Sequence, residues 1–290
     1  MTIIEALVAI ARSDRPAALA AVDTAVRQTP HALLPAALLR YLRAEADGDV
    51  YGSPDALTRF IDGGANRAVY AALHAALQAR YVALEPVSLL DLGCGEGRVA
   101  LAAAQCSVRS VDLVEPSGPL LDVALASFAT DRPRVSVRGH AQTADAFLAG
   151  LPDAARWDAV QSTFALHTMT AASRAAVLRA VARRSGRLLI AEFDVPDVED
   201  RSRAHAAYAA ERYERGLAEH VGDEVVAQGF LMPVLVGQFD PGTARHTHEQ
   251  SVSAWAAELR AAGFDAVTAS TLHPYWWADA VLIEATVAAG

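Results

Sequence analysis

Three alternate glycines, Gly93, Gly95 and Gly97, follow a short apolar run and precede an alanine-rich segment. This pattern predicts a buried strand that turns through a glycine loop into a helix. Bare backbone in such a loop lets a ligand approach closely, and the helix N-terminus offers free N–H groups and a partial positive charge. The stretch from Ser88 to Ala102 is therefore a predicted binding site for a polar ligand with a nucleoside-like or carboxylate end.

A carboxylate, Glu115, follows the glycine loop by about twenty residues, directly after the predicted strand Ser110–Val114. An acidic side chain at a strand end can accept two hydrogen bonds from ribose hydroxyls. Asp112 is the competing carboxylate, but it falls inside the predicted strand. We therefore expect Glu115, with Pro116 in the turn after it, to contact a ribose.

The glycine spacing distinguishes two classes of nucleotide-like cofactor. The dinucleotide fingerprint has its third glycine where this chain has Arg98, which is too large for close helix–strand packing. The run Asp91-x-Gly93-x-Gly95-x-Gly97 instead resembles the first motif of the class I S-adenosylmethionine (SAM)-dependent methyltransferases. The resemblance implies SAM as the cofactor.

The resemblance also implies roles for residues of this chain. Asp91 would hold the ammonium group of SAM, directly or through water, and Gly93 and Gly95 would give backbone clearance. The segment 161–164 would lie beside the methionine portion and the transferred methyl group. The implied cofactor-binding residues are Asp91, Gly93, Cys94, Gly95, Glu115, Pro116, Ala141, Gln142, Ser162 and Phe164.

The predicted adenine contacts depart from the pattern of the family. Many members have an acidic residue after the third strand, where this chain has His140 and Gln142. The amide oxygen of Gln142 would accept a hydrogen bond from the adenine amino group. The backbone N–H of Ala141 would donate to a ring nitrogen.

Histidines supply the candidates for acid–base chemistry. SAM carries its own leaving group, so the protein mainly positions the acceptor, but a hydroxyl acceptor benefits from a base with a pKa near neutrality. His167 follows the fourth predicted strand and either faces the pocket or packs beneath the next helix. His205 and Tyr208 share one face of a predicted helix and are the other catalytic candidates. His246 and His248 lack a third ligand at sensible spacing, so no metal site is predicted.

Composition bounds the class of protein. The chain has 290 residues, 53% of them hydrophobic and 20% charged, as expected of a soluble globular protein. A net charge of −9 argues against a broad nucleic-acid surface. No run is long enough to span a membrane, and residues 1–10 lack the basic start of a signal peptide, which favours a cytoplasmic location. Cys94 and Cys106 cannot build a disulfide framework.

The elements around the loop fall into two groups. Helices are expected at 2–11, 15–27, 30–46, 55–61 and 66–80. After the loop, strands at 110–114, 134–137, 157–162 and 187–193 alternate with helices at 118–128, 143–149 and 171–185. A helix at 249–262 and two antiparallel strands, 266–272 and 278–287, end the chain. Serial strand–helix units imply a parallel sheet covered on both faces. The predicted fold is α/β, a doubly wound, mostly parallel seven-stranded sheet of the Rossmann-like methyltransferase type.

The predicted domains are an N-terminal helical lid region, 1–84, and a SAM-binding methyltransferase domain, 85–290. The segment at about 195–248 interrupts the second domain. It is too long for a simple connection and is therefore predicted to be a cap insertion. The charged sequence of its first half predicts a helix or a helix pair. Residues 230–239, in its second half, are strongly apolar. The lid candidates are Tyr51, Phe60, Asn66 and Tyr70. The aromatic connection 274–277 either lines an acceptor pocket or packs against the N-terminal helices.

The predicted function is SAM-dependent methylation of a small molecule, first of all O-methylation of a secondary-metabolite-like acceptor. One alternative is a SAM-binding protein of the same fold that catalyses a non-methylating reaction such as cyclisation. The other is a non-catalytic interaction module. The expected partner is a small-molecule acceptor rather than nucleic acid or a membrane, and a homodimer is a possible assembly.

Overall fold

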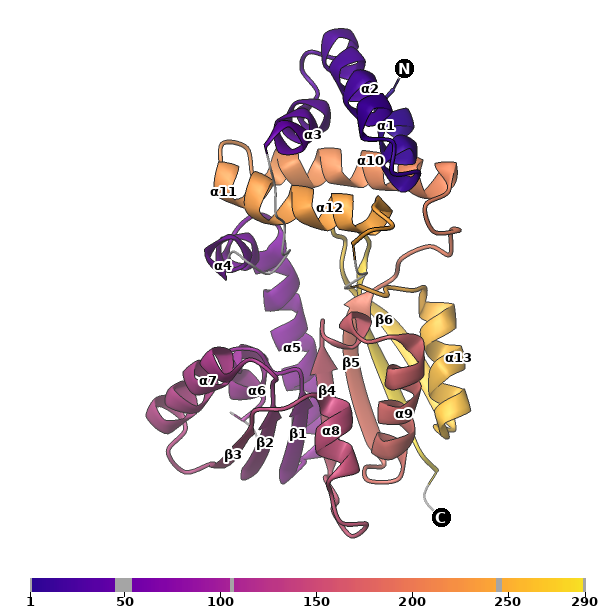
Figure 1. Cartoon of the computed structure of the whole chain (residues 1–290). Helices are drawn as coiled ribbons and strands as arrows, with labels where there is room; N and C mark the ends of the chain where they lie inside the picture. Colours follow the sequence, from indigo (N-terminus) through magenta and orange to yellow (C-terminus); the bar gives the residue numbers. More distant parts are fainter. Residues whose placement is uncertain (1, 45–53, 105–106, 244–246, 289–290) are drawn as a thin grey trace. The chain divides into compact units, whose positions relative to one another are not determined.

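The computed structural model describes residues 2–44, 54–104, 107–243 and 247–288, and the chain divides into two compact units (Figure 1). The helical unit comprises Met1–Ala68, Pro196–Thr247 and Tyr275–Ala278. The sheet unit comprises Val69–Val195, His248–Pro274 and Asp279–Gly290. Tyr51, Cys106 and His246 lie outside the described residues.

The sheet unit is built on a seven-stranded sheet with the order β3-β2-β1-β4-β5-β7-β6. The strands are β1 (Ser88–Leu92), β2 (Ser110–Val114), β3 (Ser136–His140), β4 (Ala159–Thr163), β5 (Arg187–Phe193), β6 (Ala266–His273) and β7 (Ala280–Thr286). Neighbours pair in parallel except that β7 runs antiparallel to both β5 and β6. The predicted sheet is confirmed. The strand order reverses between β1 and β4, and open α/β sheets bind ligands at the carboxyl ends of the strands at such a point.

Helices cover both faces of this sheet. They are α5 (Asn66–Leu84, in this unit from Val69), α6 (Arg98–Ala103), α7 (Gly118–Asp131), α8 (Ala144–Ala149), the short η1 (Leu166–Thr168), α9 (Ala171–Ala182) and α13 (Val252–Ala262). Because strand side chains alternate, Leu89 packs on one face with Tyr81 of α5 and Phe128 of α7. Leu90 packs on the other face with residues of α8, α9 and α13. These are called the first and the second face. A strand buried on both faces is almost entirely apolar, so Asp91 is the exception among the buried residues of β1.

The helical unit joins the N-terminal helices to the insertion. It contains α1 (Ile3–Ala11), α2 (Arg15–Gln28), α3 (Leu33–Arg43), α4 (Pro54–Asp62), α10 (Arg203–Glu219), α11 (Glu224–Val226), the π-helical turn η2 (Ala227–Leu231) and α12 (Met232–Phe239). Side chains far apart in sequence hold it together. Ala32 offers no side-chain cap for α3, and the Glu214 carboxylate of α10 accepts from the backbone N–H groups of Leu33 and Leu34 at 2.7 and 2.8 Å.

The aromatic connection between β6 and β7 packs inside the helical unit. The Tyr275 hydroxyl donates to the Asn66 side chain at 2.8 Å, and the Trp276 ring lies edge-on to Tyr213 at 5.4 Å. A Cβ at Gly216 would stand 2.8 Å from the Trp276 ring, so this glycine makes room for the indole. Of the two alternatives for residues 274–277, the structure shows packing against helices, through side chains of α10 and of the start of α5.

Some predicted boundaries are wrong. The predicted helix 30–46 begins only at Leu33, because the Ala32 N–H closes a turn onto the Thr29 carbonyl. The third strand is Ser136–His140 rather than 134–137. The apolar run 230–239, for which no helix or strand is predicted above, is helical and buries Leu235 and Phe239 completely.

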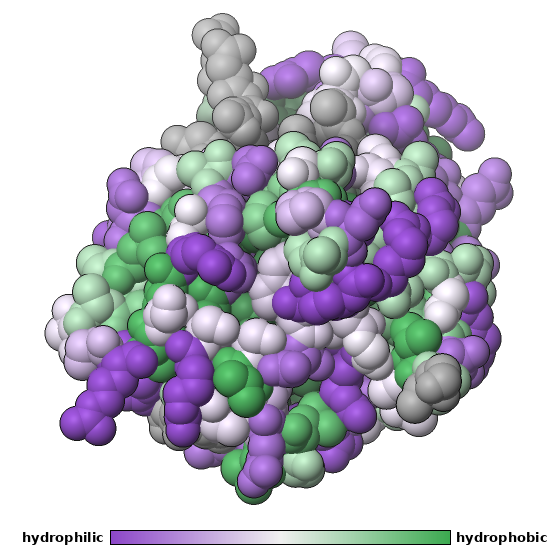
Figure 2. Space-filling view, turned by 90° about the horizontal axis from the view of Figure 1, so that it is seen from below, coloured by the Kyte–Doolittle hydropathy of each residue, from purple (hydrophilic) through white to green (hydrophobic). Residues whose placement is uncertain are grey.

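The described surface of the sheet unit exposes few large apolar residues. Val82, Val87 and Val123 are the exposed large hydrophobic residues of this unit within the described ranges. Figure 2 shows one face of the molecule on which hydrophilic and hydrophobic residues are interspersed. Single exposed apolar residues are ordinary and indicate no partner. In the described part of the chain, no helix combines the length and the apolar character needed to cross a membrane.

Candidate functional site

The glycine loop between β1 and α6 is built by three glycines in the left-handed region, with φ of 72°, 54° and 72° at Gly93, Gly95 and Gly97. A Cβ at Gly93 would lie 2.4 Å from the Ala165 Cβ, and one at Gly97 would lie 2.8 Å from the Ala124 Cβ. At Gly95 no described atom lies within 4 Å of the Cβ position. Gly93 and Gly97 therefore serve close packing. Of the two glycines expected to give backbone clearance, Gly95 has open space beside it and Gly93 does not.

Glu115 joins the end of β2 to this loop. One oxygen of its carboxylate accepts the Gly95 N–H at 3.0 Å, and the other accepts the Ser117 N–H at 2.9 Å. The Val114 carbonyl accepts the N–H of Gly93 at 2.8 Å. Glu115 is 8% exposed, and each carboxylate oxygen has a further lone pair for a ligand donor. The two features predicted to bind a nucleoside thus lie in direct contact.

Asp91 lies at the carboxyl end of β1, two residues before Gly93, and is 1% exposed. Its Oδ2 accepts a hydrogen bond from the Gln161 side-chain amide at 2.8 Å, whereas Oδ1 has no hydrogen-bond partner among the described residues. Burial raises the pKa of Asp91 to about 7; the Gln161 hydrogen bond opposes this shift and the nearby Glu115 charge adds to it. The site therefore contains a buried carboxylate that titrates near neutrality.

The remaining predicted cofactor-binding residues in the loop and at the strand ends differ in how far they are buried. Burial, with Asp91 and Glu115 nearby, raises the pKa of the free Cys94 thiol, which stays neutral. The Ser162 hydroxyl donates to the Leu92 carbonyl at 2.8 Å and is fully buried. Pro116, Ala141 and Gln142 are exposed after β2 and β3. The backbone N–H of Glu115 donates to the His140 carbonyl at 3.2 Å, which places Ala141 and Gln142 beside Glu115.

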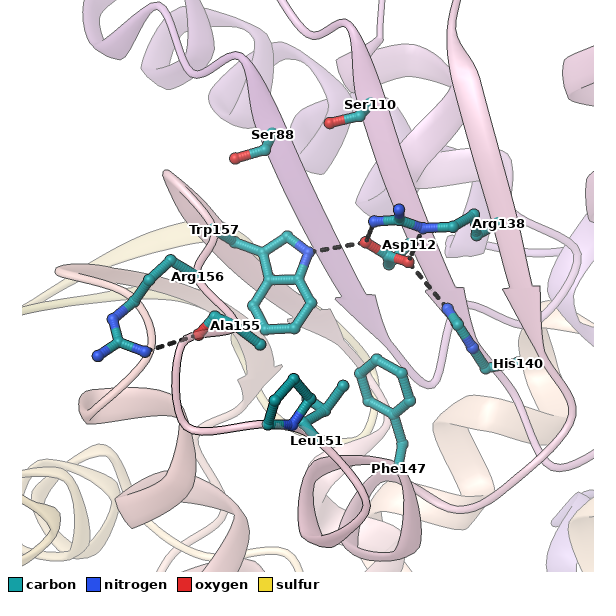
Figure 3. Close-up of a pocket in the computed structure, with 11 residues that line it drawn as sticks. Ser88, Ser110, Asp112, Arg138, His140, Phe147, Leu151, Ala155, Arg156 and Trp157 are labelled. Atoms are coloured by element: carbon teal, nitrogen blue, oxygen red, sulfur yellow. Dashed lines mark hydrogen bonds and ion pairs between the residues drawn. The ribbon is translucent and has the colours of Figure 1, made fainter.

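Asp112 belongs to a separate pocket of about 380 Å³. Figure 3 shows its carboxylate between Trp157 on one side and Arg138 and His140 on the other. It accepts two hydrogen bonds from the Arg138 guanidinium at 2.8 and 2.7 Å, one from the Trp157 indole at 2.8 Å, and contacts His140 Nε2 at 2.8 Å. Burial alone raises the pKa of Asp112, but these hydrogen bonds lower it to about 2. Strand alternation turns Asp112 to the second face with Val114, away from Asp91.

Asp112→Ala is expected to lower the free energy of unfolding by about 1–3 kcal/mol, because the buried Trp157 indole and the half-buried His140 ring lose their common partner, whereas the exposed Arg138 guanidinium can turn to water. Affinity for S-adenosylhomocysteine (SAH), the demethylated form of the predicted cofactor, should change by less than about twofold. Urea unfolding and calorimetry measure the two quantities. Glu115→Ala is the matched variant, and it should lose SAH affinity; equal losses in both variants would contradict the separation of the two carboxylates.

His167 lies in η1, after β4, and forms a dyad with Glu192 of β5. Its Nδ1 lies 2.8 Å from Glu192 Oε2, and its backbone N–H donates to Oε1 at 3.1 Å. Burial disfavours the charged ring, but the Glu192 carboxylate outweighs it and raises the pKa of His167 to about 9. The imidazole is therefore charged at neutral pH, in contrast to the near-neutral base expected from the sequence.

The His167–Glu192 contact should stabilise the fold in a pH-dependent way. The pKa of His167 is raised from 6.5 to about 9 on folding, so the contribution is complete below pH 6.5 and is lost as pH rises through about 9. It amounts to about 3 kcal/mol at most. Urea unfolding at pH 6.5, 8 and 9.5 should show the difference between the wild type and His167→Gln shrinking with pH. A difference that stays constant would contradict the assignment.

His205 and Tyr208 are engaged within the helical unit. The His205 ring stacks on Phe239 at 4.6 Å, and its Nδ1 accepts the Arg201 N–H at 3.1 Å. The Tyr208 hydroxyl donates to the Trp277 carbonyl at 2.6 Å. These contacts suit packing, and a catalytic role for either residue stays a prediction. His167 is the catalytic candidate that shares the sheet unit with the glycine loop.

Aromatic rings surround the segment after β4. Phe164 has a φ of 52°, a conformation that costs energy for a side chain with a Cβ and that clusters at functional sites. Its ring stacks on Phe193 of β5 at 4.8 Å and lies edge-on to Tyr70 of α5 at 5.8 Å. Phe164 follows the strand that carries Gln161 and precedes Ala165, the residue in contact with Gly93. The strained turn therefore borders the glycine loop.

Within the described ranges, no three His, Cys, Asp or Glu side chains gather as metal ligands would. Tyr81 and Glu192 were not among the predicted site residues, and Gln161 was named only as part of a segment. A polar residue inside a buried strand was the available signal for Gln161 and Glu192. Tyr81 continues the apolar spacing of Leu73 and Leu77 in α5, which predicts burial but not the contact of its hydroxyl.

Comparison with known proteins identifies the domain. Residues 89–185 match the family described as "Methyltransferase domain", a span that contains the glycine loop, Glu115 and Gln161. No curated protein matches the chain in sequence.

Solved structures share the fold at low sequence identity. The magnesium protoporphyrin IX methyltransferase of Synechocystis with bound SAH is 17% identical, with a TM-score of 0.53 over 83% of this chain and 97% of that one. The YcgJ protein of Bacillus subtilis is 18% identical, with a TM-score of 0.51 over 76% and 100%. A putative O-methyltransferase of Nostoc punctiforme is 16% identical, with a TM-score of 0.50 over 98% and 72%. These similarities establish the sheet architecture.

Proposed function

We propose that this chain, a class I SAM-dependent methyltransferase by its domain and its sheet, transfers a methyl group to a hydroxyl of a small, partly hydrophobic molecule. The observation that carries the cofactor assignment is the cluster around the glycine loop. There Glu115 hydrogen-bonds Gly95, and Asp91 keeps one buried carboxylate oxygen unpaired. The identity of the acceptor and the atom methylated are the proposed part.

The residues present fit SAM. A buried carboxylate oxygen without a donor is costly, and an ammonium group is the donor that satisfies it best. The open space at Gly95 would admit the cofactor against bare backbone, and Glu115 has lone pairs for ribose hydroxyls. SAM supplies a methyl group on a sulfonium centre that carries its own leaving group.

A small acceptor fits the charge and the aromatic residues of the chain. The net charge of −9 disfavours a nucleic acid, and Phe164, Phe193 and Tyr70 form a half-buried apolar group at the strand ends beside the loop. Two proteins that share the fold are named a magnesium protoporphyrin IX methyltransferase and a putative O-methyltransferase, which agrees with this acceptor class.

His167 is the residue proposed to act on the acceptor hydroxyl. Its Nδ1 is held by Glu192, so proton exchange with an acceptor would use Nε2. Because the pKa of His167 is about 9, it serves as a base in the fraction of molecules that have lost the proton. Methyl transfer should therefore become faster as pH rises toward 9.

The helical lid over the acceptor stays a prediction. Two of the lid candidates are committed to packing within the helical unit, since Phe60 stacks on Phe230 at 4.3 Å and Asn66 is bonded to Tyr275. Tyr70, by contrast, belongs to the sheet unit beside Phe164. The boundaries 1–84 and 195–248, the cytoplasmic location and a homodimer stay predictions.

The test uses SAM labelled in its methyl group. The full-length protein is incubated with panels of small hydroxyl, amine and carbon acceptors, with RNA and peptide arms alongside. We expect label to enter hydroxyl acceptors, and His167→Gln to slow transfer without changing SAH affinity. Transfer to another acceptor class would overturn the hydroxyl assignment. Bound SAM without any transfer favours a non-methylating reaction, and the absence of SAH binding at millimolar concentration favours the interaction module.

A further inference from the structure

Three buried side chains from three elements form one hydrogen-bonded chain on the first face of the sheet. The Tyr81 hydroxyl of α5 donates to Gln161 Oε1 of β4 at 2.5 Å, and the Gln161 amide donates from Nε2 to Asp91 Oδ2 of β1 at 2.8 Å. Tyr81 and Gln161 are fully buried, and Asp91 is 1% exposed. These contacts join residues 80 and 70 positions apart in the sequence.

The direction of these hydrogen bonds matters. A phenol donor on Oε1 fixes which end of the Gln161 amide faces Asp91, because the carbonyl end is already engaged. The amide N–H is thereby held against the carboxylate. Without the phenol, the amide can turn over and present its carbonyl oxygen to the carboxylate, which is repulsive.

Packing alone does not explain this arrangement. The neighbours of these residues on the same face are mostly leucines, valines and alanines, and a polar network in an apolar core is costly unless every member is satisfied. Here one atom is not satisfied, since Asp91 Oδ1 has no partner among the described residues. The unpaired oxygen belongs to a residue two positions before Gly93, next to the loop that Glu115 ties to β2.

We infer that Tyr81 and Gln161 are positioning residues of the proposed SAM site, which hold the Asp91 carboxylate so that its unpaired oxygen accepts a hydrogen bond from the ammonium group of the cofactor. The inference rests on the proposed function. It predicts that the two residues affect only the amino-acid half of the cofactor. Adenosine recognition, through Glu115 and the open backbone at Gly95, should not depend on them.

Two ligands separate these halves in calorimetry with the full-length protein. SAH carries the amino-acid group, and 5′-methylthioadenosine keeps the adenosine and the sulfur but lacks that group. Tyr81→Phe removes one oxygen and retains the ring, and Gln161→Leu removes the amide. Both variants should bind SAH about tenfold more weakly than the wild type and bind 5′-methylthioadenosine within about twofold of it.

A pH series supplies a readout that a purely structural role would not move. The ionisable groups that face Asp91 are Glu115 from the end of β2, the Cys94 thiol of the loop, and Tyr81 through Gln161. Since the ammonium group binds the ionised carboxylate, SAH affinity of the wild type should fall as pH falls from 7.5 to 5.5. Because the Gln161 hydrogen bond lowers the pKa of Asp91, its loss in either variant should move this midpoint to higher pH. Binding of 5′-methylthioadenosine should show no such midpoint.

The possible results distinguish failure of the proposed function from failure of the inference about Tyr81 and Gln161. If the wild type binds neither ligand, the proposed function fails, and the inference fails with it. If the wild type binds both ligands, the function stands, and the inference is overturned when Tyr81→Phe keeps full SAH affinity. It is also overturned when the variants weaken both ligands equally, or when the midpoint stays fixed. Tyr81→Phe decides these outcomes even if Gln161→Leu does not fold, and far-UV circular dichroism checks both.

Discussion

Gly95→Val is expected to abolish SAH binding, with at least about a 100-fold loss of affinity, while the far-UV circular dichroism spectrum stays unchanged. The Cβ position at Gly95 meets no described atom within 4 Å, so the new side chain occupies open space in the loop rather than the core. That space is where the cofactor is proposed to approach the backbone. The φ of 54° adds a strain of about 1–2 kcal/mol, which the fold should tolerate.

The matched control is Gly263→Val. Gly263 ends α13 in the same unit, has a φ of 106°, and also has no described atom within 4 Å of its Cβ position. It imposes at least as much backbone strain away from the glycine loop, and SAH affinity should be retained. Gly93→Ala is the opposite case, because its Cβ would collide with Ala165 and should lower stability. If Gly95→Val binds SAH as the wild type does, the loop is not the cofactor site.

Asp91→Asn should have two opposite effects, a loss of about 100-fold in SAH affinity and a gain in stability of the ligand-free protein at pH 8. The pKa of Asp91 is raised from 3.8 to about 7 in the folded state. Its contribution to stability is therefore complete below pH 3.8 and is lost as pH rises through about 7. At pH 8 the buried charge costs about 4 kcal/mol, and asparagine removes the charge.

Urea unfolding of the ligand-free wild type and Asp91→Asn at pH 5 and pH 8 measures this effect. Other groups titrate over the same range, so the informative quantity is the difference between the two proteins. The difference should favour asparagine at pH 8 and become much smaller at pH 5. A wild type that is the more stable protein at pH 8 would show that Asp91 has a satisfied partner in the ligand-free state, and the unpaired oxygen would no longer indicate a ligand.

The serial strand–helix pattern predicted the parallel sheet because strands covered on both faces are short apolar runs, and each is followed by a helix of recognisable period. The glycine loop was predicted for a similar local reason, since left-handed positions such as Gly95 favour one residue type. Glu115 was preferred over Asp112 as the ribose ligand because Glu115 follows the predicted strand, whereas Asp112 lies inside it. In the structure Glu115 accepts a hydrogen bond from Gly95 and Asp112 accepts one from Trp157, and ribose binding by Glu115 stays a prediction.

The exact ends of helices and strands, and the contacts between distant segments, were harder to predict from the sequence. The third strand is displaced by two or three residues from the predicted run, and the helix expected from residue 30 begins at Leu33. The N-terminus of that helix is capped by Glu214, which lies 181 positions from Leu33. No pattern within one segment encodes a hydrogen bond of that span.

The amino-acid sequence by itself determined the class of fold, the place of the glycine loop and the carboxylate beside it, because these depend on residue type and on spacing along one segment. Only the tertiary structure decided that Tyr81 and Gln161 meet Asp91, that Glu192 holds His167, and that the N-terminal helices and the insertion form one unit. The physical reason is that a buried polar atom takes whichever partner the packing brings within hydrogen-bond distance. That partner is set by how distant segments pack, which local periodicity does not specify.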